Sequence, residues 1–215
     1  DGADGATLFC DLESLLPASD PFDRQTTIGF GGFIELARIA AAEQGLRLES
    51  TSFPEGPALP NLDRRPVAQL RFAPDPAAPK DPLYAAIRKR STNRAKYDTD
   101  AQLASPELDA LREQAVAGTE IDATASRDRV SELRTICIDA LVAESGTDAI
   151  WAQQVSHTRI GRAEIEAQPD GMDIAGPGPE AARAFGFLTR DMLKKRSSAA
   201  GRAAIHNSVE TAATA

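Results

Sequence analysis

The sequence of 215 residues predicts an α+β fold, or a loosely alternating α/β fold, built around one sheet. Segments with the apolar period of a helix are interleaved with short, mostly isolated segments that alternate as strands do. Alanine supplies much of the 42% hydrophobic content while aromatic residues reach only 5%, which favours closely packed helices. A charged fraction of 26% is ordinary for a globular chain and argues against disorder.

The first third of the chain predicts two elements before a pair of strands. Residues 6–10 alternate as a short strand, and a long helix follows Asp20-Pro21. Gly45 is a plausible stop for that helix, because glycine commonly ends helices in a left-handed conformation. Strands are then expected over residues 46–53 and 67–72, separated by a loop rich in proline and glycine. The apolar stripe of the long helix is formed by Ile28, Phe33, Leu36, Ala37 and Ala40.

The rest of the chain predicts mainly helices. Residues 74–80 are rich in proline and alanine and are expected to be a linker. Ser105-Pro106 and Ser126 are expected to open helices, because hydroxyl side chains cap N-termini and proline suits the first turn. The further expected elements are a helix from Asp81, a strand over 119–125, a helix ending at Gly146, helices over 149–166 and 180–195, an irregular loop over 168–179, and a tail from Ser197 that is helical or partly disordered.

Charge and composition restrict the classes of function. The net charge of −8 and the pI near 4.9 argue against nucleic-acid binding, because binding to phosphate backbones is favoured by clustered Lys and Arg side chains. No apolar stretch approaches the ~20 residues of a membrane span. Cys10 and Cys137 are too few for a disulfide framework or a thiolate metal cage, so we expect buried or idle thiols in a reducing compartment. We also expect that sequence is missing at both ends, because a strand is already under way at Ala6 and the chain stops inside an alanine-rich run.

A basic segment at the end of the helix expected from Asp81 is the strongest candidate site. Arg88, Lys89 and Arg90 are followed by Ser91, Thr92, Asn93 and Arg94, where the chain must turn. Guanidinium groups match phosphate oxygens in pairs, and hydroxyl and backbone N–H groups can complete the shell. The segment could therefore hold one small phosphate. From the residues alone, a solvated basic helix end that complements the helix dipole is the favoured alternative, because charges near helix ends are common.

The motif Arg90-Ser91-Thr92-Asn93-Arg94 resembles a pattern of the nitroreductase superfamily, closest to its Acg-type FMN-binding branch. Two further stretches resemble the same branch: residues 20–25 followed by Gly29-Phe30-Gly31-Gly32, and residues 159–172. Together these stretches span most of residues 6–190. Ser91 stands where a basic or imidazole side chain is usual, and the segment of the type Asn-Thr-Gln-Pro-Trp is absent.

The resemblance implies a mixed sheet surrounded by helices, with FMN at the interface of two nitroreductase-like units. Ordinary members are homodimers, and Acg-type chains resemble two fused units. We therefore expect an incomplete pseudo-dimer, with part of a first unit in residues 1–73 and a second unit in residues 81–215 that is incomplete at its C-terminus. Arg90 is expected to hold the FMN phosphate, Ser91 and Thr92 to bond phosphate or ribityl oxygens, and Arg94 to reach the flavin or brace the loop.

The implied activity is an FMN-dependent oxidoreductase that takes electrons from NAD(P)H and passes them to a nitro, quinone or similar acceptor. No side chain is assigned as catalytic, because the flavin itself carries the chemistry. The alternative is a flavin-sequestering binding protein whose FMN is covered by a lid, for which residues 168–179 are the candidate. We expect a cytoplasmic protein, although periplasmic export remains open because some relatives carry an export signal.

Other motifs predict no site. Gly29-Phe30-Gly31-Gly32 lacks the spacing and the preceding strand of a dinucleotide loop, so we expect these glycines to let the helix pack closely. His157 and His206 are the only histidines, and neither has the spacing of a metal set or a nucleophile elbow nearby. Both are expected to be surface or structural residues.

Overall fold

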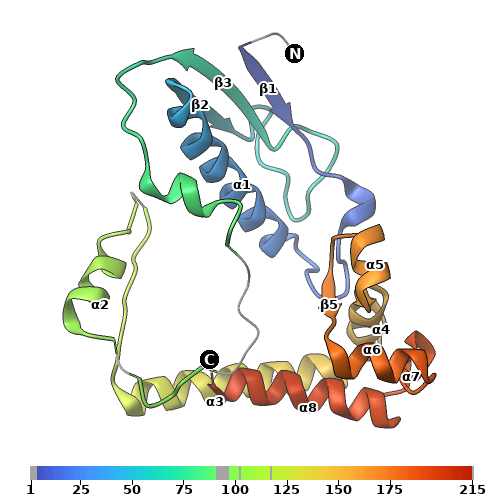
Figure 1. The fold of residues 1–215 in the computed structure, drawn as a ribbon. Helices are drawn as coiled ribbons and strands as arrows, with labels where there is room; N and C mark the ends of the chain where they lie inside the picture. The colour runs from blue at the N-terminus through green and yellow to red at the C-terminus, as the bar shows by residue number, and fades with distance from the viewer. Residues whose placement is uncertain (1–3, 91–96, 102, 117, 215) are drawn as a thin grey trace. The chain divides into compact units, whose positions relative to one another are not determined.

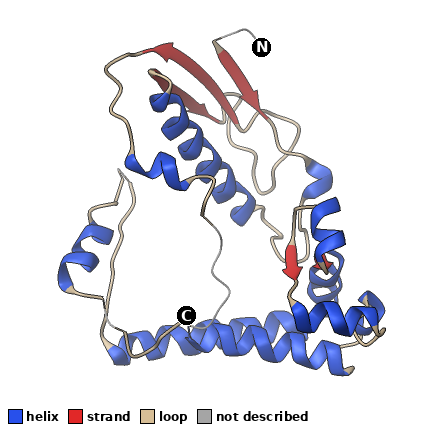
Figure 2. Cartoon of the chain, viewed as in Figure 1, coloured by secondary structure: helices blue, strands red, loops and turns tan. Residues whose placement is uncertain are grey.

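The computed structural model describes residues 4–90, 97–101, 103–116 and 118–214, with side chains up to residue 210 (Figure 1). The chain forms two compact units, residues 1–92 and residues 93–215. Both units combine helices with short strands (Figure 2), which confirms the predicted α+β class. The two units are described separately below.

The first unit is a three-stranded antiparallel sheet covered on one face by a long helix. The strand order is β1-β3-β2, with β1 at Gly5–Leu8, β2 at Leu46–Ser52 and β3 at Ala68–Pro74. The helix α1, Arg24–Glu43, packs against β2. Short 3-10 helices lie at Leu12–Ser14 (η1) and Pro82–Ala86 (η2). All three strands lie close to their predicted positions.

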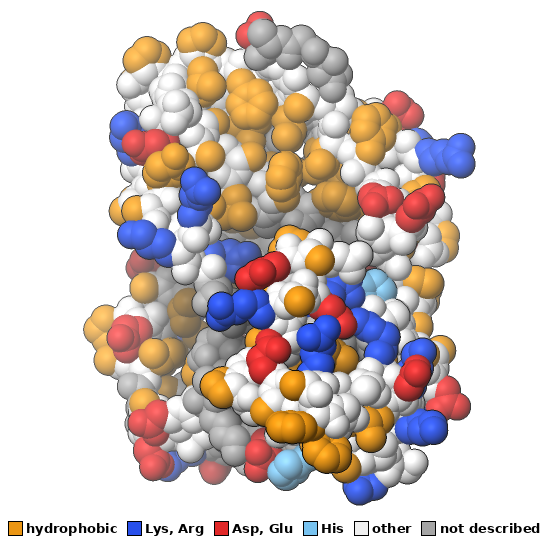
Figure 3. Space-filling model, turned by 45° about the vertical axis from the view of Figure 1, so that its right-hand side comes forward, with side chains coloured by type: hydrophobic (Ala, Val, Ile, Leu, Met, Phe, Trp, Pro, Cys, Tyr) orange, Lys and Arg blue, Asp and Glu red, His pale blue; other side chains and the backbone are white. Residues whose placement is uncertain are grey.

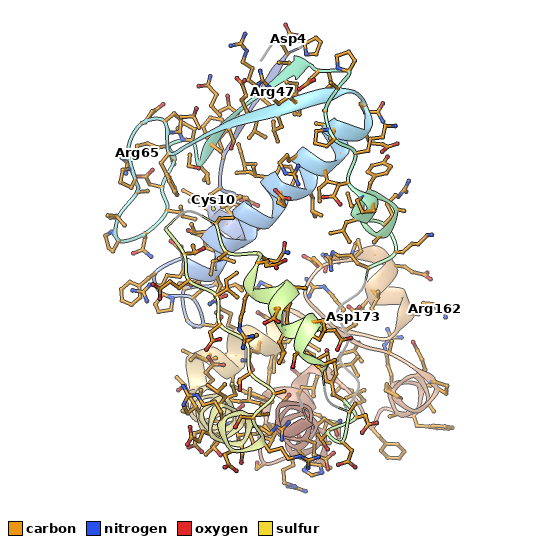
Figure 4. All side chains as sticks on the ribbon, turned by 90° about the vertical axis from the view of Figure 1, so that its left-hand side faces the viewer. Asp4, Cys10, Arg47, Arg65, Arg162 and Asp173 are labelled. Carbon is orange, nitrogen blue, oxygen red and sulfur yellow. The ribbon has the colours of Figure 1, made fainter. Side chains whose placement is uncertain are left out.

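Side-chain alternation decides which face of this sheet is covered. Ala68 and Leu70 on β3 are buried, and in the antiparallel register Leu70 lies opposite Ser50 of β2 and Ala6 of β1. The opposite face is polar, and on it Glu49 is paired in register with Arg71. Figure 4 labels Arg47, which comes from β2, the neighbouring strand of this sheet. A sheet with one apolar and one polar face needs only one covering layer, and α1 provides it.

The start of α1 is fixed by two buried carboxylates. Asp20 accepts hydrogen bonds from the backbone N–H groups of Arg24 (2.8 Å), Gln25 (3.2 Å) and Thr26 (2.9 Å). These are donors that the first turn of a helix cannot satisfy internally. Asp23, at φ +51°, accepts hydrogen bonds from the side chain of Asn61 (3.1 Å) and the backbone of Leu62 (2.9 Å). The loop between β2 and β3 is thereby tied to the helix N-terminus.

The second unit is mainly helical. Its two strands, β4 (Thr158–Ile160) and β5 (Met172–Ile174), pair in parallel, and α5 (Arg162–Ala167) connects them. Its core gathers Trp151, Val155, Ile160 and Leu193, and the indole N–H of Trp151 donates to the carbonyl of Leu193 at 3.0 Å. The other helices are α2 (Ser105–Arg112), α3 (Arg127–Gly146), α4 (Asp148–Ser156), α6 (Pro177–Ala184), α7 (Arg190–Lys194) and α8 (Ala199–Thr214).

Several predicted elements of this unit are wrong. The described residues form two separate sheets rather than one. Residues 119–125 form no strand, because none of them is paired in a sheet. The helix expected over 149–166 is interrupted by β4, and Gly161 at φ +80° redirects the chain there. The helix expected over 180–195 is likewise divided into α6 and α7, with Gly186 at φ +74° between them.

Two predicted helix starts are confirmed in position, although their hydroxyl caps are absent. Ser126 precedes α3 and its carbonyl accepts from Val130, yet its side chain makes no capping hydrogen bond. In α2 the N-cap is Ala104, which has no side-chain acceptor. The carboxylate of Glu107 instead accepts from the backbone N–H of Ala104 at 2.6 Å. Position in the sequence therefore indicated these starts better than the capping chemistry did.

Residues 75–80, part of the predicted linker, contact the first unit. The backbone N–H of Asp75 donates to the carbonyl of Gly45 at 2.8 Å, and Lys80 pairs with Glu43 at 3.1 Å. Gly45 itself ends the turn after α1 at φ +68°, the conformation predicted for it. The segment after β3 is thus held against the C-terminal end of α1.

Candidate phosphate-binding site

The basic segment begins at η2. Asp81 is its N-cap, and its carboxylate accepts from the backbone N–H of Leu83 at 2.8 Å. Pro82 occupies the first turn, where its missing N–H costs nothing. The α-helix predicted from Asp81 is wrong, because only this short 3-10 helix forms. Of the three apolar residues expected on one face, Leu83 and Ala86 are exposed and only Ile87 is half-buried, so little packing within the described chain stabilises a longer helix.

Two ion pairs attach this region to α1. Arg38 binds Glu35 through two hydrogen bonds (2.8 and 2.6 Å) and lies 3.6 Å from Asp81. The hydrogen bond from Arg38 lowers the pKa of Glu35. Lys80 pairs with Glu43 further along the same helix. The N-terminal side of the basic segment is therefore anchored on α1.

Arg88, Lys89 and Arg90 follow η2 as an exposed group of three cations, called here the basic cluster. The backbone N–H groups of Lys89 and Arg90 both donate to the carbonyl of Ala86, at 2.9 and 2.8 Å. Within the described ranges, none of the three side chains forms an ion pair. Ser91, Thr92 and Arg94, the other expected FMN contacts, lie outside the described residues.

The electrostatics of the basic cluster suit an anion. Three adjacent positive side chains repel one another, and the part of the chain that is described offers them no carboxylate. A phosphate would relieve that repulsion through charge-assisted hydrogen bonds. Water and salt would also screen it, since all three side chains are exposed. The arrangement can therefore bind a phosphate but shows no enclosed pocket around one.

The N-terminal half of α1 is an open apolar surface in the same unit. Ile28 and Phe33 are both more than half exposed. Apart from adjacent residues and the backbone of the helix itself, no described atom lies within 4 Å of a Cβ placed on Gly29, Gly31 or Gly32. The expectation that these glycines let another element pack closely is therefore wrong for the described part of this chain. Hydrophobic side chains also reach the molecular surface elsewhere, as Figure 3 shows in orange.

The residues singled out between 159 and 172 build the β4–β5 connection. Arg159, whose side chain is only 9% exposed, donates to Asp170 from Nε (3.0 Å) and from a terminal nitrogen (2.7 Å). Gly171 adopts φ +78°, and a Cβ there would lie 2.1 Å from the carbonyl oxygen of His157. The expected irregular loop over 168–179 is thus wrong, because it contains β5 and the start of α6.

Each of the two histidines lies close to a residue four positions away in the sequence, and the two cysteines differ in burial. Nδ1 of His157 lies 3.0 Å from the carbonyl of Gln153, and His206 lies 3.5 Å from Glu210. No group of three potential metal ligands occurs among the described residues. Cys10 is half-buried, and burial, followed by the charges of Asp23 and Asp11, raises the pKa of its thiol. Cys137 is exposed, so of the two expected alternatives, buried or unreactive, burial does not apply to it.

Three open depressions stand out on the described surface, and the basic cluster lines none of the three. One, of about 470 Å³, is bordered by Trp151, and its cations Lys194 and Arg196 already pair with Asp191 and Asp148. A second, of about 570 Å³, lies on the polar face of the first sheet. The third, of about 590 Å³, is lined by α5 and α6; Figure 4 labels one of its residues, Arg162.

Comparison with known proteins gives no further guidance. No family model, curated protein or solved structure matches the chain. Within the described ranges, no helix is both long and apolar enough to cross a membrane.

Proposed function

We propose that this chain is part of an FMN-dependent oxidoreductase of the nitroreductase type, with a nitroreductase-like fold completed as a fused pseudo-dimer or a homodimer. It would take electrons from NAD(P)H and deliver them to a nitro, quinone or similar small acceptor. The basic cluster is the observation that carries the proposal. Its cations have no counter-ion in the described chain, and Lys80 and Asp81, which precede it, form ion pairs with α1.

The chemistry of the donor set fits the FMN phosphate. The guanidinium of Arg90 can give two parallel hydrogen bonds to phosphate oxygens, and the hydroxyls of Ser91 and Thr92 follow it in sequence. Arg94 adds a second guanidinium at the end of the motif. Bound FMN would supply the electron-transfer chemistry, and the residues of this chain would bind and orient it.

The exposed apolar half of α1 also supports the proposal. A flavin ring needs a surface that excludes water, and Ile28, Phe33 and the bare glycines beside them offer such a surface in the same unit as the basic cluster. Residues of that kind are costly to leave in water without a partner. A cofactor or a second unit would cover them.

A flavin-sequestering binding protein would use the same phosphate contacts. That alternative relied on residues 168–179 as a lid, and β5 now occupies part of this segment. Mixing the FMN-loaded protein with NAD(P)H and a quinone separates the two functions. Bleaching of the flavin absorption followed by its recovery indicates turnover, whereas unchanged absorption indicates storage.

The central test is FMN binding by substituted proteins. Arg90→Ala removes a charge-assisted contact worth about 1.5–3 kcal/mol, so we expect FMN affinity to fall roughly tenfold to a hundredfold. Quenching of flavin fluorescence during titration measures the affinity. The matched control is Arg88→Ala, which removes the same charge from the same exposed cluster and should have a much smaller effect. Equal losses at both positions would indicate general electrostatic attraction, and a protein that never binds FMN would refute the proposal.

A further inference from the structure

The helix α3 carries an exposed face with apolar residues at its centre and opposite charges at its two ends. Successive residues of an α-helix are rotated by about 100°, so residues three, four and seven apart share a face. In one such set every residue is exposed, and this set is called here the α3 face. It consists of Arg129, Leu133, Ile136, Cys137, Ala140 and Glu144.

This face is not the one that packs inside the second unit. The side chains of α3 that are buried or half-buried lie on another side of the helix, and α3 packs there against α8 and α4. In contrast, Ile136 is 61% exposed and Leu133 is 41% exposed. The two apolar residues therefore contribute little to the core of their own unit, and water contacts them.

The spacing of the α3 face reads the same in both directions, as on any helix face of this kind, so the residue types that an antiparallel partner would bring together decide the fit. From Arg129 to Glu144 the intervals are 4, 3, 1, 3 and 4 residues. If a second α3 is laid antiparallel with its centre between Ile136 and Cys137, Leu133 lies opposite Ala140 of the partner subunit. Ile136 lies opposite Cys137 of the partner subunit, and each Arg129 lies opposite Glu144 of the partner subunit. A contact of this kind is isologous, as a twofold axis requires.

We propose that α3 pairs antiparallel with α3 of a second copy of this chain, through the α3 face. The small Ala140 leaves room for Leu133, as interlocking side chains need at a helix–helix contact. The charges at the two ends are complementary only in the antiparallel direction, because a parallel pair would bring like charges together. They select the direction more than they add affinity.

Existing charges on α3 are compatible with this arrangement. Arg129 already bonds to Glu132 at 2.8 Å, and Glu144 of the partner subunit would add a second carboxylate to the same guanidinium. Within the described chain, Glu144 has no ion pair of its own. Glu132 and Asp139 lie further around the helix, at the exposed margin of the face, where water and salt screen them.

Sedimentation of the full chain across a range of concentrations tests the proposal. A single helix pair falls at the small end of protein interfaces, below about 1,200 Å², so we expect a reversible dimer of moderate affinity. Ile136→Glu places two carboxylates beside the twofold axis and should abolish the dimer. Val142→Glu, at a 53% exposed residue on the opposite side of α3, is the matched control and should leave it intact. A chain that stays monomeric at every concentration would overturn the proposal.

A charge exchange identifies the direction of pairing. Arg129→Glu and Glu144→Arg should each weaken the dimer about tenfold at low salt, because each change turns two attractive contacts into repulsive ones. The double variant should restore most of the affinity. Arg127→Glu makes the same charge change away from the α3 face and should have little effect. A double variant as weak as the single ones would contradict antiparallel pairing.

The native thiol gives an independent readout. Cys137 lies next to the proposed axis, so a short bis-maleimide should join two copies in a Cys10→Ser background. The covalent dimer should disappear in Ile136→Glu and persist in Val142→Glu. Equal cross-linking in both variants would show that it arises from random collision of exposed thiols.

Discussion

Asp20 shows how one side chain sets the start of a long helix. It lies four residues before the first residue of α1 and satisfies three backbone donors and the hydroxyl of Thr26 (3.0 Å). We expect Asp20→Ala to lower the free energy of unfolding by about 1–2 kcal/mol at pH 7, the range measured for lost N-caps. Denaturant titration followed by far-ultraviolet circular dichroism measures the change. Asp11→Ala, which removes the cap of the short helix η1, is the control and should cost less.

The stabilisation by Asp20 should also depend on pH. Burial opposes ionisation of Asp20, but the hydrogen bonds from Thr26, Gln25 and Arg24 outweigh it and lower the pKa of the carboxyl. A carboxyl whose pKa is lowered by folding contributes stability that is complete above its ordinary value, about 3.9, and is lost as the pH falls through the folded value. The difference between wild type and Asp20→Ala should therefore shrink below about pH 4. A difference that stays constant down to pH 2 would contradict this origin.

Part of this residue-scale detail was readable in the sequence. Asp20-Pro21 before an apolar helical stripe is a recognisable helix start, and Gly45 was correctly placed as the stop. Gly171 was expected only as part of an irregular loop, although the carbonyl of His157 excludes any side chain there. That contact joins two segments whose proximity arises from the pairing of β4 with β5, which local sequence does not encode.

At the scale of elements, Arg190 joins three helices of the second unit. From α7 it donates to the carbonyl of Val155 at the end of α4 (2.7 Å) and to Glu164 on α5 (2.9 Å). Removing it leaves the Val155 carbonyl without this donor. Because the Arg190 side chain is one-third exposed, we expect Arg190→Ala to cost about 1–2 kcal/mol, the lower part of the range for such losses.

Unfolding of the second unit followed by Trp151 fluorescence measures this loss. The tryptophan lies in the core that α4 and α7 share, so it reports on the helices that Arg190 connects. Lys194→Ala removes another cation of α7, one that only forms an exposed pair with Asp191. That control should change stability by less than about 1 kcal/mol. Similar losses for both variants would argue against a specific role for Arg190.

Elements with a strong apolar period were predicted better than short ones. The helix α1 and the strands β2 and β3 lie close to their expected bounds, and on β3 buried residues alternate with exposed ones. The strands β4 and β5 have three residues each, too few for a period to show. They were expected to be part of a helix and a loop. Their pairing depends on tertiary contacts such as the bond between Arg159 and Asp170.

At the scale of the whole molecule, both units leave apolar surface exposed. In the first unit this surface is the N-terminal half of α1, and in the second it includes the α3 face. The sequence indicated a cofactor site from the basic cluster. Leu133, Ile136 and Ala140 belong to the apolar residues expected on the helix that ends at Gly146, and only the structure shows that they face solvent.

Pairing through α3 predicts that the stability of the second unit depends on protein concentration. A dimer that dissociates on unfolding gains about 1.4 kcal/mol per mole of dimer for each tenfold rise in concentration above its Kd. Trp151 is the only tryptophan and lies on α4, which packs against α3, so its fluorescence follows the relevant transition. We expect the midpoint of thermal unfolding to rise with concentration in the wild type and in Val142→Glu. It should stay constant in Ile136→Glu, since that variant is monomeric throughout. Midpoints that rise equally in all three proteins would place the association elsewhere on the chain.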